Sequence, residues 1–334
     1  MIRTLLLAVL TLATPTLAAD PPALAPSEIV AAAPRTDWIA IPASDLLVMD
    51  LAPGLNGKPR RVVIQLMPPP FSQGWIGNIR KLAAAHWWDG LSINRVQDNY
   101  VVQWGDADGE DKAKARRLPN GLATMPEADY VVEVDDHEEL RKTATRFMLR
   151  TMEEEIADEF VERGSPFDGT EQTRSLDDNF YRGWPLSLET ERPGSSGQMA
   201  PIHCYSMVGV GRDLPPNTGS GAELYTVIGH APRHLDRNIA LVGRVIEGIE
   251  HLSSLTRGTG ALGFYETPEE RTTITAIRLG SEVAALPAYE YLSTTSETFA
   301  RYADARANRR EPFFIKPAGG ADICNIPVPV RRAK

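Results

Sequence analysis

Cysteine, aromatic residues and clusters of positive charge are all scarce in this sequence. Only 2 of its 334 residues are Cys, and 7% are Phe, Trp or Tyr. Two cysteines exclude a small domain stapled by several disulfides. Acidic residues outnumber basic ones by 44 to 35, which gives a net charge of -9. Binding to nucleic-acid phosphates needs clustered positive charge, so we expect no nucleic-acid partner.

Long hydrophobic runs are also absent, because no stretch approaches the roughly 18 apolar residues of a membrane-spanning helix. A shorter apolar run, Leu5 to Leu12, follows Arg3 and precedes the small residues Ala18 and Ala19. This order is typical of a secretory signal peptide. We therefore predict a signal peptide over residues 1–19, cleaved near Ala18 or Ala19, no membrane span, and a periplasmic or secreted bacterial protein.

Glycine and proline are plentiful, with 26 of each, which favours turns and loops over a helical bundle. Residues 20–37 are rich in Ala and Pro and show little apolar periodicity. Such a composition predicts a flexible linker, with order beginning near Trp38.

Two blocks of the chain carry the short apolar or alternating runs of β-strands. The first block predicts strands at 46–51 and 61–66, a helix at 75–84, and two strands on either side of a turn at 97–99. The second block predicts strands near 202–209, 222–228, 240–245 and 271–279, and a helix over 247–255. The sequence is therefore mainly β.

The stretch between the two blocks is the least strand-like part of the chain. Asp136 can cap a helix that we predict over 137–162, whose apolar stripe from Leu140 to Phe160 must pack on something. Six acidic residues between Glu153 and Glu162 are interpreted as a solvated face, with a docking surface for basic clients as the alternative. A further helix is predicted over 287–309.

The motifs of both blocks resemble those of the cyclophilin-type peptidyl-prolyl cis-trans isomerases. The run Trp88–Val96 followed by Tyr100–Asp106 is similar to the family signature Y-[DE]-G-x-x-F-H-R-V…G-F-M-x-Q-G-G-D. In the second block, Ser206-Met207 resembles S-M-A-N, Gly221–Tyr225 resembles G-S-Q-F-F, and His234–Asp236 with Val242–Gly248 resembles H-L-D-G…F-G-R-V-x-E-G. The two matches occur in the family's order.

The resemblance implies a closed eight-stranded antiparallel β-barrel capped by two helices. The cyclophilin-like domain would cover residues 38–280, with a partly helical insertion at about 107–201 and a C-terminal extension at 281–334. Closing a sheet into a barrel leaves no strand edge unpaired, which suits a chain with this many short strands.

The resemblance also implies a function, namely isomerisation of X-Pro bonds in proline-containing client polypeptides, with no cofactor, to assist the folding of exported proteins. Rotation about such a bond breaks amide resonance and crosses a barrier of about 18–20 kcal/mol. By resemblance, Arg95 is the donor to the prolyl nitrogen and Gln103 binds the substrate backbone. The implied substrate-binding residues are Tyr100, Val101, Val208, Gly209, Glu223, Tyr225, His234 and Leu235.

The sequence departs from the family pattern around this site. The differences are Asn94 for His, Gly209 for Asn, Glu223 for Gln, His234 for Trp, and Asn238 or Ile239 in place of a late His. They alter the rim of the pocket and leave the central arginine in place. An alternative function is therefore a non-catalytic cyclophilin-like binding or chaperone protein that uses the insertion for partner contacts.

The remaining candidate sites are few. Cys204 and Cys324 could form one disulfide in an oxidising compartment, or remain two buried thiols. His230 and His234 have a spacing that suits metal binding on a helix, but Pro232 between them predicts a loop, so we expect no metal site. No phosphate-binding glycine motif follows a predicted strand. The oligomeric state is not encoded in any recognisable pattern.

Overall fold

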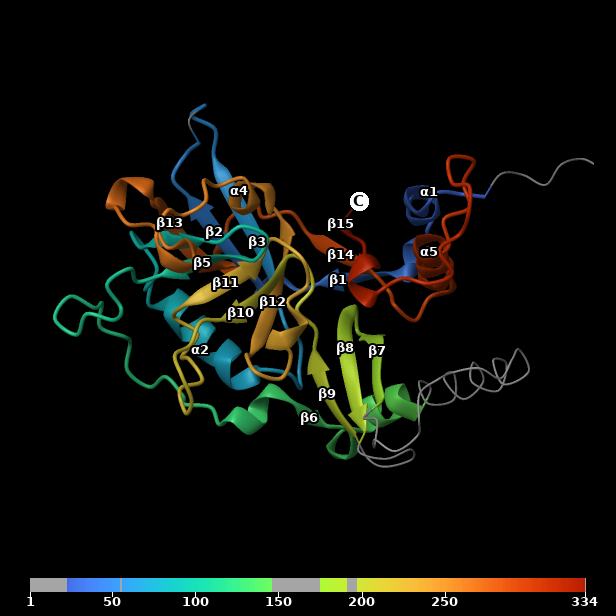
Figure 1. The fold of residues 1–334 in the computed structure, drawn as a ribbon, viewed down its shortest axis with the longest axis horizontal. Helices are drawn as coiled ribbons and strands as arrows, with labels where there is room; N and C mark the ends of the chain where they lie inside the picture. The colour runs from blue at the N-terminus through green and yellow to red at the C-terminus, as the bar shows by residue number, and fades with distance from the viewer. Residues whose placement is uncertain (1–22, 55, 146–174, 191–196, 334) are drawn as a thin grey trace, which may run out of the picture.

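A closed barrel of antiparallel strands forms the centre of the molecule. The computed structural model describes residues 23–54, 56–145, 175–190 and 197–333 (Figure 1). The barrel strands follow one another in the order β10-β11-β5-β4-β13-β2-β3-β12. Their bounds are β2 (Leu46–Leu51), β3 (Arg60–Leu66), β4 (Ser92–Val96), β5 (Val101–Gly105), β10 (Met207–Val210), β11 (Leu224–Val227), β12 (Leu241–Glu247) and β13 (Thr272–Leu279). The predicted eight-stranded barrel is confirmed.

Helix α2 (Gln73–Ala84) confirms the helix predicted at 75–84. Its apolar face, which includes the fully buried Trp75, Ile79 and Leu82, belongs to the same hydrophobic core as the barrel strands. The indole N–H of Trp75 donates to the carbonyl of Thr218 at 3.0 Å. The helix is therefore fixed on the barrel by both apolar burial and a buried hydrogen bond.

The helix expected over 247–255 is much shorter in the structure. Only α4 (Glu250–Ser253), a single turn, is helical there. Gly248 has a φ of +85°, and a Cβ atom at this position would lie 2.1 Å from the carbonyl oxygen of Arg61. This left-handed residue ends β12 and cannot be part of a right-handed helix, so the helix starts after it.

The insertion forms a sheet, contrary to the expectation that it is the least strand-like part of the chain. Strands β6 (Val132–Glu133), β7 (Ser175–Tyr181), β8 (Trp184–Thr190) and β9 (Gly197–Pro201) pair in the order β6-β9-β8-β7. Arg182 and Gly183, with φ of +48° and +83°, make the tight turn that joins β7 to β8. This turn was overlooked because Arg-Gly is a weaker turn signal than Asn-Gly.

The helix predicted over 137–162 lies only partly within the described residues. Residues 138–145 are helical, with Leu140 and Ala144 buried, and the rest, including the acidic residues of 153–162, lies outside the described part. Asp136 lies in the short 3-10 turn Val134–Asp136, and His137 stands between it and the first helical residue.

The linker expected over 20–37 is wrong for its described part. Residues Pro26–Ala31 form helix α1, with Pro26 in its first turn and the carboxylate of Glu28 accepting the backbone N–H of Ala25 at 2.7 Å. Its buried Ile29 packs with Phe299 and Tyr302 of helix α5 (Glu297–Ala307). An Ala/Pro-rich segment is therefore ordered here by tertiary packing that its own composition does not encode.

The N-terminal segment and the C-terminal extension share a sheet. Strand β1 (Trp38–Ile41) pairs with β14 (Tyr289–Leu292), which pairs with β15 (Val330–Arg332). β1 thus belongs with the extension and not with the barrel, so the boundary drawn at residue 38 is misplaced. The helix predicted over 287–309 is also wrong at its start, because β14 occupies 289–292 and Ser296 caps α5 by accepting the N–H of Phe299 at 3.1 Å.

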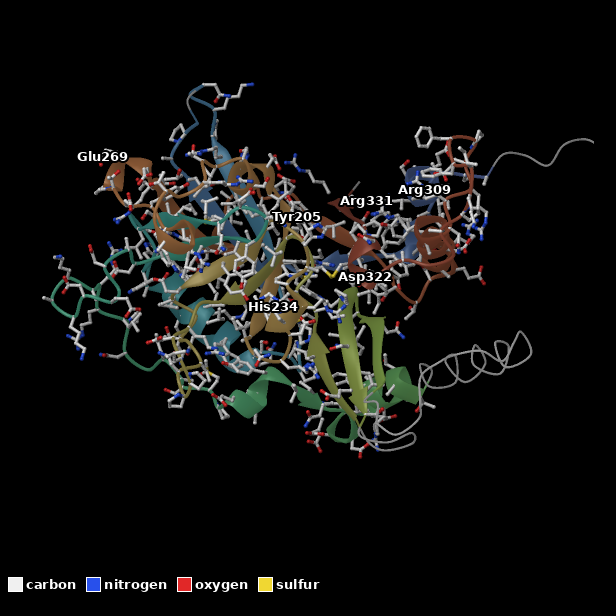
Figure 2. The ribbon with its side chains drawn as sticks, in the orientation of Figure 1. Tyr205, His234, Glu269, Arg309, Asp322 and Arg331 are labelled. Atoms are coloured by element: carbon white, nitrogen blue, oxygen red, sulfur yellow. A yellow bond between two sulfur atoms is a disulfide. The ribbon has the colours of Figure 1, made fainter. Side chains whose placement is uncertain are left out.

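One further contact ties the three strands of this sheet together, and another ties the extension to the barrel. Arg331, labelled in Figure 2, pairs with Glu290 at 2.7 Å and lies 3.6 Å from the centroid of the Trp38 ring, so it spans all three strands. Cys204 and Cys324 form a disulfide, with their Cα atoms 5.1 Å apart, between the segment that leads into β10 and the extension. Among the described residues, no helix has the length and apolar character needed to cross a membrane.

Candidate active site

Arg95 lies near the end of β4, directly opposite Gln103 of β5 in the strand register. Its guanidinium donates to the side-chain oxygen of Gln103 at 3.2 Å and, through Nε, to the carbonyl of Leu262 at 2.8 Å. A third hydrogen bond goes to the side-chain oxygen of Gln97. Three acceptors from different segments therefore fix the position of this cation.

Two aromatic rings flank the same guanidinium. Its central carbon lies 5.7 Å from the centroid of Tyr100 and 5.2 Å from that of Phe264. Burial lowers the pKa of Arg95, although an arginine in a protein keeps its charge. A partly desolvated cation held between rings interacts more strongly with a nearby acceptor than one in bulk water does.

An open groove of about 1070 Å³ has Arg95 and Gln103 in its wall. Beside the guanidinium the groove is lined by Val101, Tyr225, Leu235 and Ile239. Val101 and Tyr225 are buried members of one hydrophobic cluster, against which Leu235 and Ile239 pack. We call these four residues the apolar cup. The groove thus places a fixed cation next to an apolar surface.

Seven of the ten site residues suggested by the resemblance line this groove: Arg95, Tyr100, Val101, Gln103, Glu223, Tyr225 and Leu235. Val208 and Gly209 are buried behind it in β10. A Cβ atom on Gly209 would lie 2.3 Å from the hydroxyl oxygen of Tyr225, so glycine is required for that ring to take its place. Gly209 therefore shapes the cup by leaving room for the Tyr225 ring.

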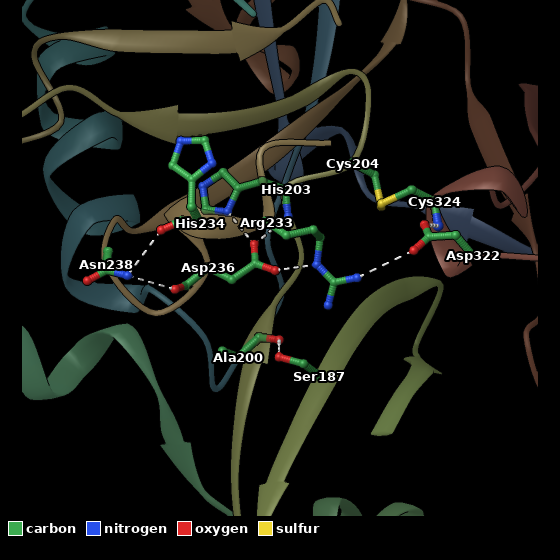
Figure 3. A network of polar contacts seen from close by, with 10 residues as sticks. All are labelled: Ser187, Ala200, His203, Cys204, Arg233, His234, Asp236, Asn238, Asp322 and Cys324. Carbon is green, nitrogen blue, oxygen red and sulfur yellow. Dashed lines mark hydrogen bonds and ion pairs between the residues drawn. A yellow bond between two sulfur atoms is a disulfide. The ribbon is translucent and has the colours of Figure 1, made fainter. Parts of the chain in front are cut away.

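His234 does not line the groove among the described residues. Its ring instead stacks on Tyr100, with centroids 6.2 Å apart and planes at 17°. Of the two candidates for the late histidine position, Ile239 lines the groove, whereas the side-chain amide of Asn238 donates to the carbonyls of His234 and Asp236, both at 3.2 Å (Figure 3). An isoleucine therefore makes the cup more apolar than an imidazole would.

Glu223 places a carboxyl group in the groove wall next to Gln103. Its Oε1 atom accepts the backbone N–H of Asp106 at 2.6 Å. Burial raises the pKa of Glu223 to about 7, while the hydrogen bond from the Asp106 backbone and the polar side chains of Asn94 and Gln103 hold it lower than burial alone would. The structure thus puts a titratable group in contact with the glutamine that contacts Arg95.

The comparisons with known proteins show the family of the chain. Residues 75–279 match the family described as cyclophilin type peptidyl-prolyl cis-trans isomerase/CLD. The chain belongs to this family. Membership makes it a peptidyl-prolyl cis-trans isomerase, and the barrel described above is the cyclophilin fold.

Solved cyclophilin structures are similar to this cyclophilin. The crystal structure of AquaCyp293 from Hirschia baltica has a TM-score of 0.60 at 20% sequence identity and covers 89% of this chain and 94% of its own. A cyclophilin type peptidyl-prolyl cis-trans isomerase from Cryptosporidium parvum has a TM-score of 0.37 at 10% identity and covers 70% of this chain and 97% of its own. No curated protein matches the sequence.

A polar network around Asp236 is drawn in Figure 3, and its member His203 contacts the cup of this cyclophilin. The ring of His203, which is fully buried, stacks on Tyr225 with centroids 6.3 Å apart. Asp236 accepts the backbone N–H of His203 at 2.9 Å, contacts its Nδ1 at 2.8 Å and accepts from Nε of Arg233 at 2.6 Å. Arg233 lies 3.7 Å from Asp322 of the extension. The rim of the site is therefore connected to the C-terminal segment.

The loop that covers Arg95 lies outside the motifs that predict the site. Leu262, whose carbonyl binds Arg95, and Phe264 lie in a segment that carries Gly258, Gly260 and Gly263. Gly263 has a φ of +80°, and a Cβ atom there would lie 2.7 Å from the Cα of Gln97. Three closely spaced glycines next to exposed apolar residues were the available signal for a loop that packs against the site.

The insertion also contributes to the groove, through Arg116 and Leu118. The guanidinium of Arg116 donates to the carbonyls of Trp87 and Asp89, both at 2.8 Å, which fastens the insertion to the barrel beside the site. Within the described residues, no group of three or more His, Cys, Asp or Glu side chains could hold a metal ion.

Proposed function

We propose that this cyclophilin catalyses X-Pro isomerisation with Arg95 as its electrostatic catalyst, and that its clients are exported proteins. As the X-Pro bond rotates, amide resonance is lost and the prolyl nitrogen becomes a hydrogen-bond acceptor. A donor placed at that nitrogen therefore stabilises the twisted state more than either planar isomer. No covalent intermediate is needed.

The observation that carries the proposal is the fixed guanidinium beside the apolar cup. A guanidinium has five N–H donors, and the acceptors on Leu262, Gln103 and Gln97 leave donors for a substrate. The cup, which ends at Leu235 and Ile239, suits the pyrrolidine ring of proline. Because the guanidinium is already oriented, little reorganisation accompanies catalysis, and one such donor contributes about 10²–10³ in rate.

The proposed role in export rests on two features of the chain. Residues 1–19 have the charge and apolar pattern of a signal peptide. The Cys204–Cys324 disulfide suits an oxidising compartment such as the periplasm. N-terminal sequencing of the protein recovered from a periplasmic fraction tests this part, and an intact N-terminus on protein found only in the cytoplasm would overturn it.

The catalytic part is tested by a protease-coupled assay on a proline-containing peptide, with wild type, Arg95→Ala and Arg95→Lys. We expect Arg95→Ala to lower kcat/KM by about 10²-fold and Arg95→Lys to restore little of it, because an ammonium cannot reproduce the fork of donors. Circular dichroism checks that the variants fold. Wild-type and Arg95→Ala rates that are equal and at background would overturn the proposal and leave peptide binding without catalysis.

A further inference from the structure

Two departures from the family motif meet in the wall of the groove. Asn94 stands where the family has His, and Glu223 stands where it has Gln. The structure brings them together, because the side chain of Asn94 is close enough to the carboxyl group of Glu223 to lower its pKa. Asn94 is 6% exposed and its side-chain oxygen has no hydrogen-bond partner among the described residues, as expected if its NH₂ group faces the carboxyl. The two replacements thus form one unit.

Glu223 is held tightly by backbone that only glycine permits. A Cβ atom on Gly105 would lie 2.0 Å from Oε1 of Glu223, and one on Gly211 would lie 2.9 Å from its Cβ. The backbone N–H of Gly211 also donates to the carbonyl of Glu223 at 2.8 Å. The carboxyl group therefore has a defined position at the end of β5.

A chain of polar contacts leads from this carboxyl group through Gln103 to Arg95. The amide of Gln103 has a donor end and an acceptor end, which neighbouring groups must orient. The Gln103 side chain lowers the pKa of the Glu223 carboxyl, and its Oε1 accepts from Arg95 at 3.2 Å. Its Nε2 is the end near Glu223, because a Cβ atom on Gly211 would lie 3.6 Å from that nitrogen and 2.9 Å from the Cβ of Glu223. An ionised carboxylate only accepts, so it binds the NH₂ end and turns the oxygen toward the guanidinium. A protonated carboxyl has an O–H that competes for that oxygen.

We propose that Glu223 is a positioning residue whose ionised carboxylate orients the Gln103 amide, and through it the Arg95 guanidinium, so that isomerase activity depends on deprotonation of this one half-buried carboxyl group. The proposal deepens the function proposed above and rests on Arg95 being the catalyst. It makes the enzyme a sensor of pH in the neutral range, because burial raises the pKa of Glu223 to about 7.

Several charged groups face Glu223 or share its groove. Asp106, at the end of β5, raises the pKa of Glu223 by its negative charge. Arg95 approaches from β4, and Glu110, Arg116, Arg212 and Asp213 line the same groove from the insertion and from the segment after β10. The imidazole of His234 stacks on Tyr100 at the rim. The experiment must therefore distinguish the titration of Glu223 from the effects of these groups.

The test measures kcat/KM between pH 5.5 and 8.5 with a protease-free assay of a proline peptide. For wild type we expect a rise of about tenfold from pH 6 to pH 8, as one group with a pKa near 7 loses its proton. Glu223→Gln should be flat over this range, and Asp106→Asn should move the midpoint to lower pH. His234→Phe, which keeps a ring against Tyr100, and Glu269→Gln, an exposed carboxyl in Figure 2, should keep the wild-type midpoint.

A second measurement does not depend on catalysis. The ¹⁵N shift of the Gln103 side-chain amide, followed by NMR without substrate, should titrate near pH 7 in wild type and not in Glu223→Gln. A Gln103 signal that does not respond, or a wild-type pH profile retained in Glu223→Gln, overturns the inference. A responding amide together with full activity in Arg95→Ala would instead overturn the proposed catalyst and leave the chain of polar contacts established.

Discussion

The guanidinium of Arg244 lies 4.6 Å from the centroid of the Trp184 ring, at the place where the barrel, the insertion and the C-terminal extension meet. Arg244 belongs to β12 and is 5% exposed, and Trp184 begins β8 of the insertion. The Nε of Arg244 donates to the side chain of Gln65 at 2.9 Å, and its NH1 group donates to the carbonyl of Gly183 at 2.7 Å. Burial lowers the pKa of Arg244 to about 10, so it stays a cation at neutral pH.

Replacing Arg244 by alanine should destabilise the protein strongly. The change leaves two buried acceptors, on Gln65 and Gly183, without a donor, at about 1–3 kcal/mol each, and it also removes the contact with Trp184. We expect a loss of about 3 kcal/mol in the free energy of unfolding, measured by denaturant titration. Arg332→Ala is the matched control, because Arg332 is 62% exposed and its ion pair with Glu247 should contribute at most about 1 kcal/mol. Equal losses for the two variants would contradict this role of Arg244.

The disulfide should be a large source of stability. It joins residues 120 positions apart, and a crosslink over a loop of that length lowers the entropy of the unfolded chain by an equivalent of about 5 kcal/mol. The double variant Cys204→Ser, Cys324→Ser should therefore unfold at a lower denaturant concentration than oxidised wild type. Reduced wild type is the control and should coincide with the double variant. If the double variant instead unfolded at the same denaturant concentration as oxidised wild type, the crosslink would not stabilise the native state.

Glu223→Gln should make the protein more stable at alkaline pH. The pKa of Glu223 is about 7 in the folded state and near 4.5 in a solvated chain. Between these values the folded state keeps a proton that the unfolded state has lost, so wild-type stability falls as the pH rises from about 4.5 to 7. The amide of Glu223→Gln does not ionise, so the variant avoids this loss. We expect the variant to be about 1–2 kcal/mol more stable than wild type at pH 8, with the difference shrinking toward pH 4.5. A difference that does not vary with pH would rule out ionisation as its cause.

Gly263→Ala should impair catalysis through the loop over Arg95. Gly263 has a φ of +80°, and an added Cβ atom would press on Gln97, so the loop that supplies the Leu262 carbonyl must move. We expect kcat/KM to fall about tenfold, equivalent to about 1.4 kcal/mol. Gly319→Ala is the control, because Gly319 has a φ of +84° but no atom within 4 Å of the added Cβ. A similar loss of activity in both variants would mean that backbone strain alone, and not the contact with Arg95, is responsible.

The barrel could be predicted because each of its elements carries a local signal. The alternating residues of Arg271–Leu279 and the turn between Val96 and Val101 are visible in the sequence itself. The order of the family motifs predicts that the strands close into a barrel. The positions of Arg95 and Gln103 followed from the same motifs. They face each other because β4 and β5 pair with a bulge between Ile93 and Arg95.

The parts that could not be predicted depend on contacts between distant segments. Helix α1 is ordered by Phe299, and β1 by β14, and neither partner is visible from the composition of residues 20–37. The network of His203 and Asp236 next to the cup was missed for the same reason, because a lone buried histidine gives no periodic signal. That Asn94 and Glu223 touch could be learned only from the fold.

The pairing of β1 with β14 also sets an order of assembly for the newly made chain. Trp38 is among the first described residues to be synthesised, yet its partner Leu292 lies in the extension, beyond the last barrel strand. Until that extension has been made, Ile29 and Trp38 lack the residues that bury them, and the edge of β1 has no strand to pair with. An incomplete chain therefore displays exposed apolar residues that chaperones and proteases recognise, and only a finished one conceals them.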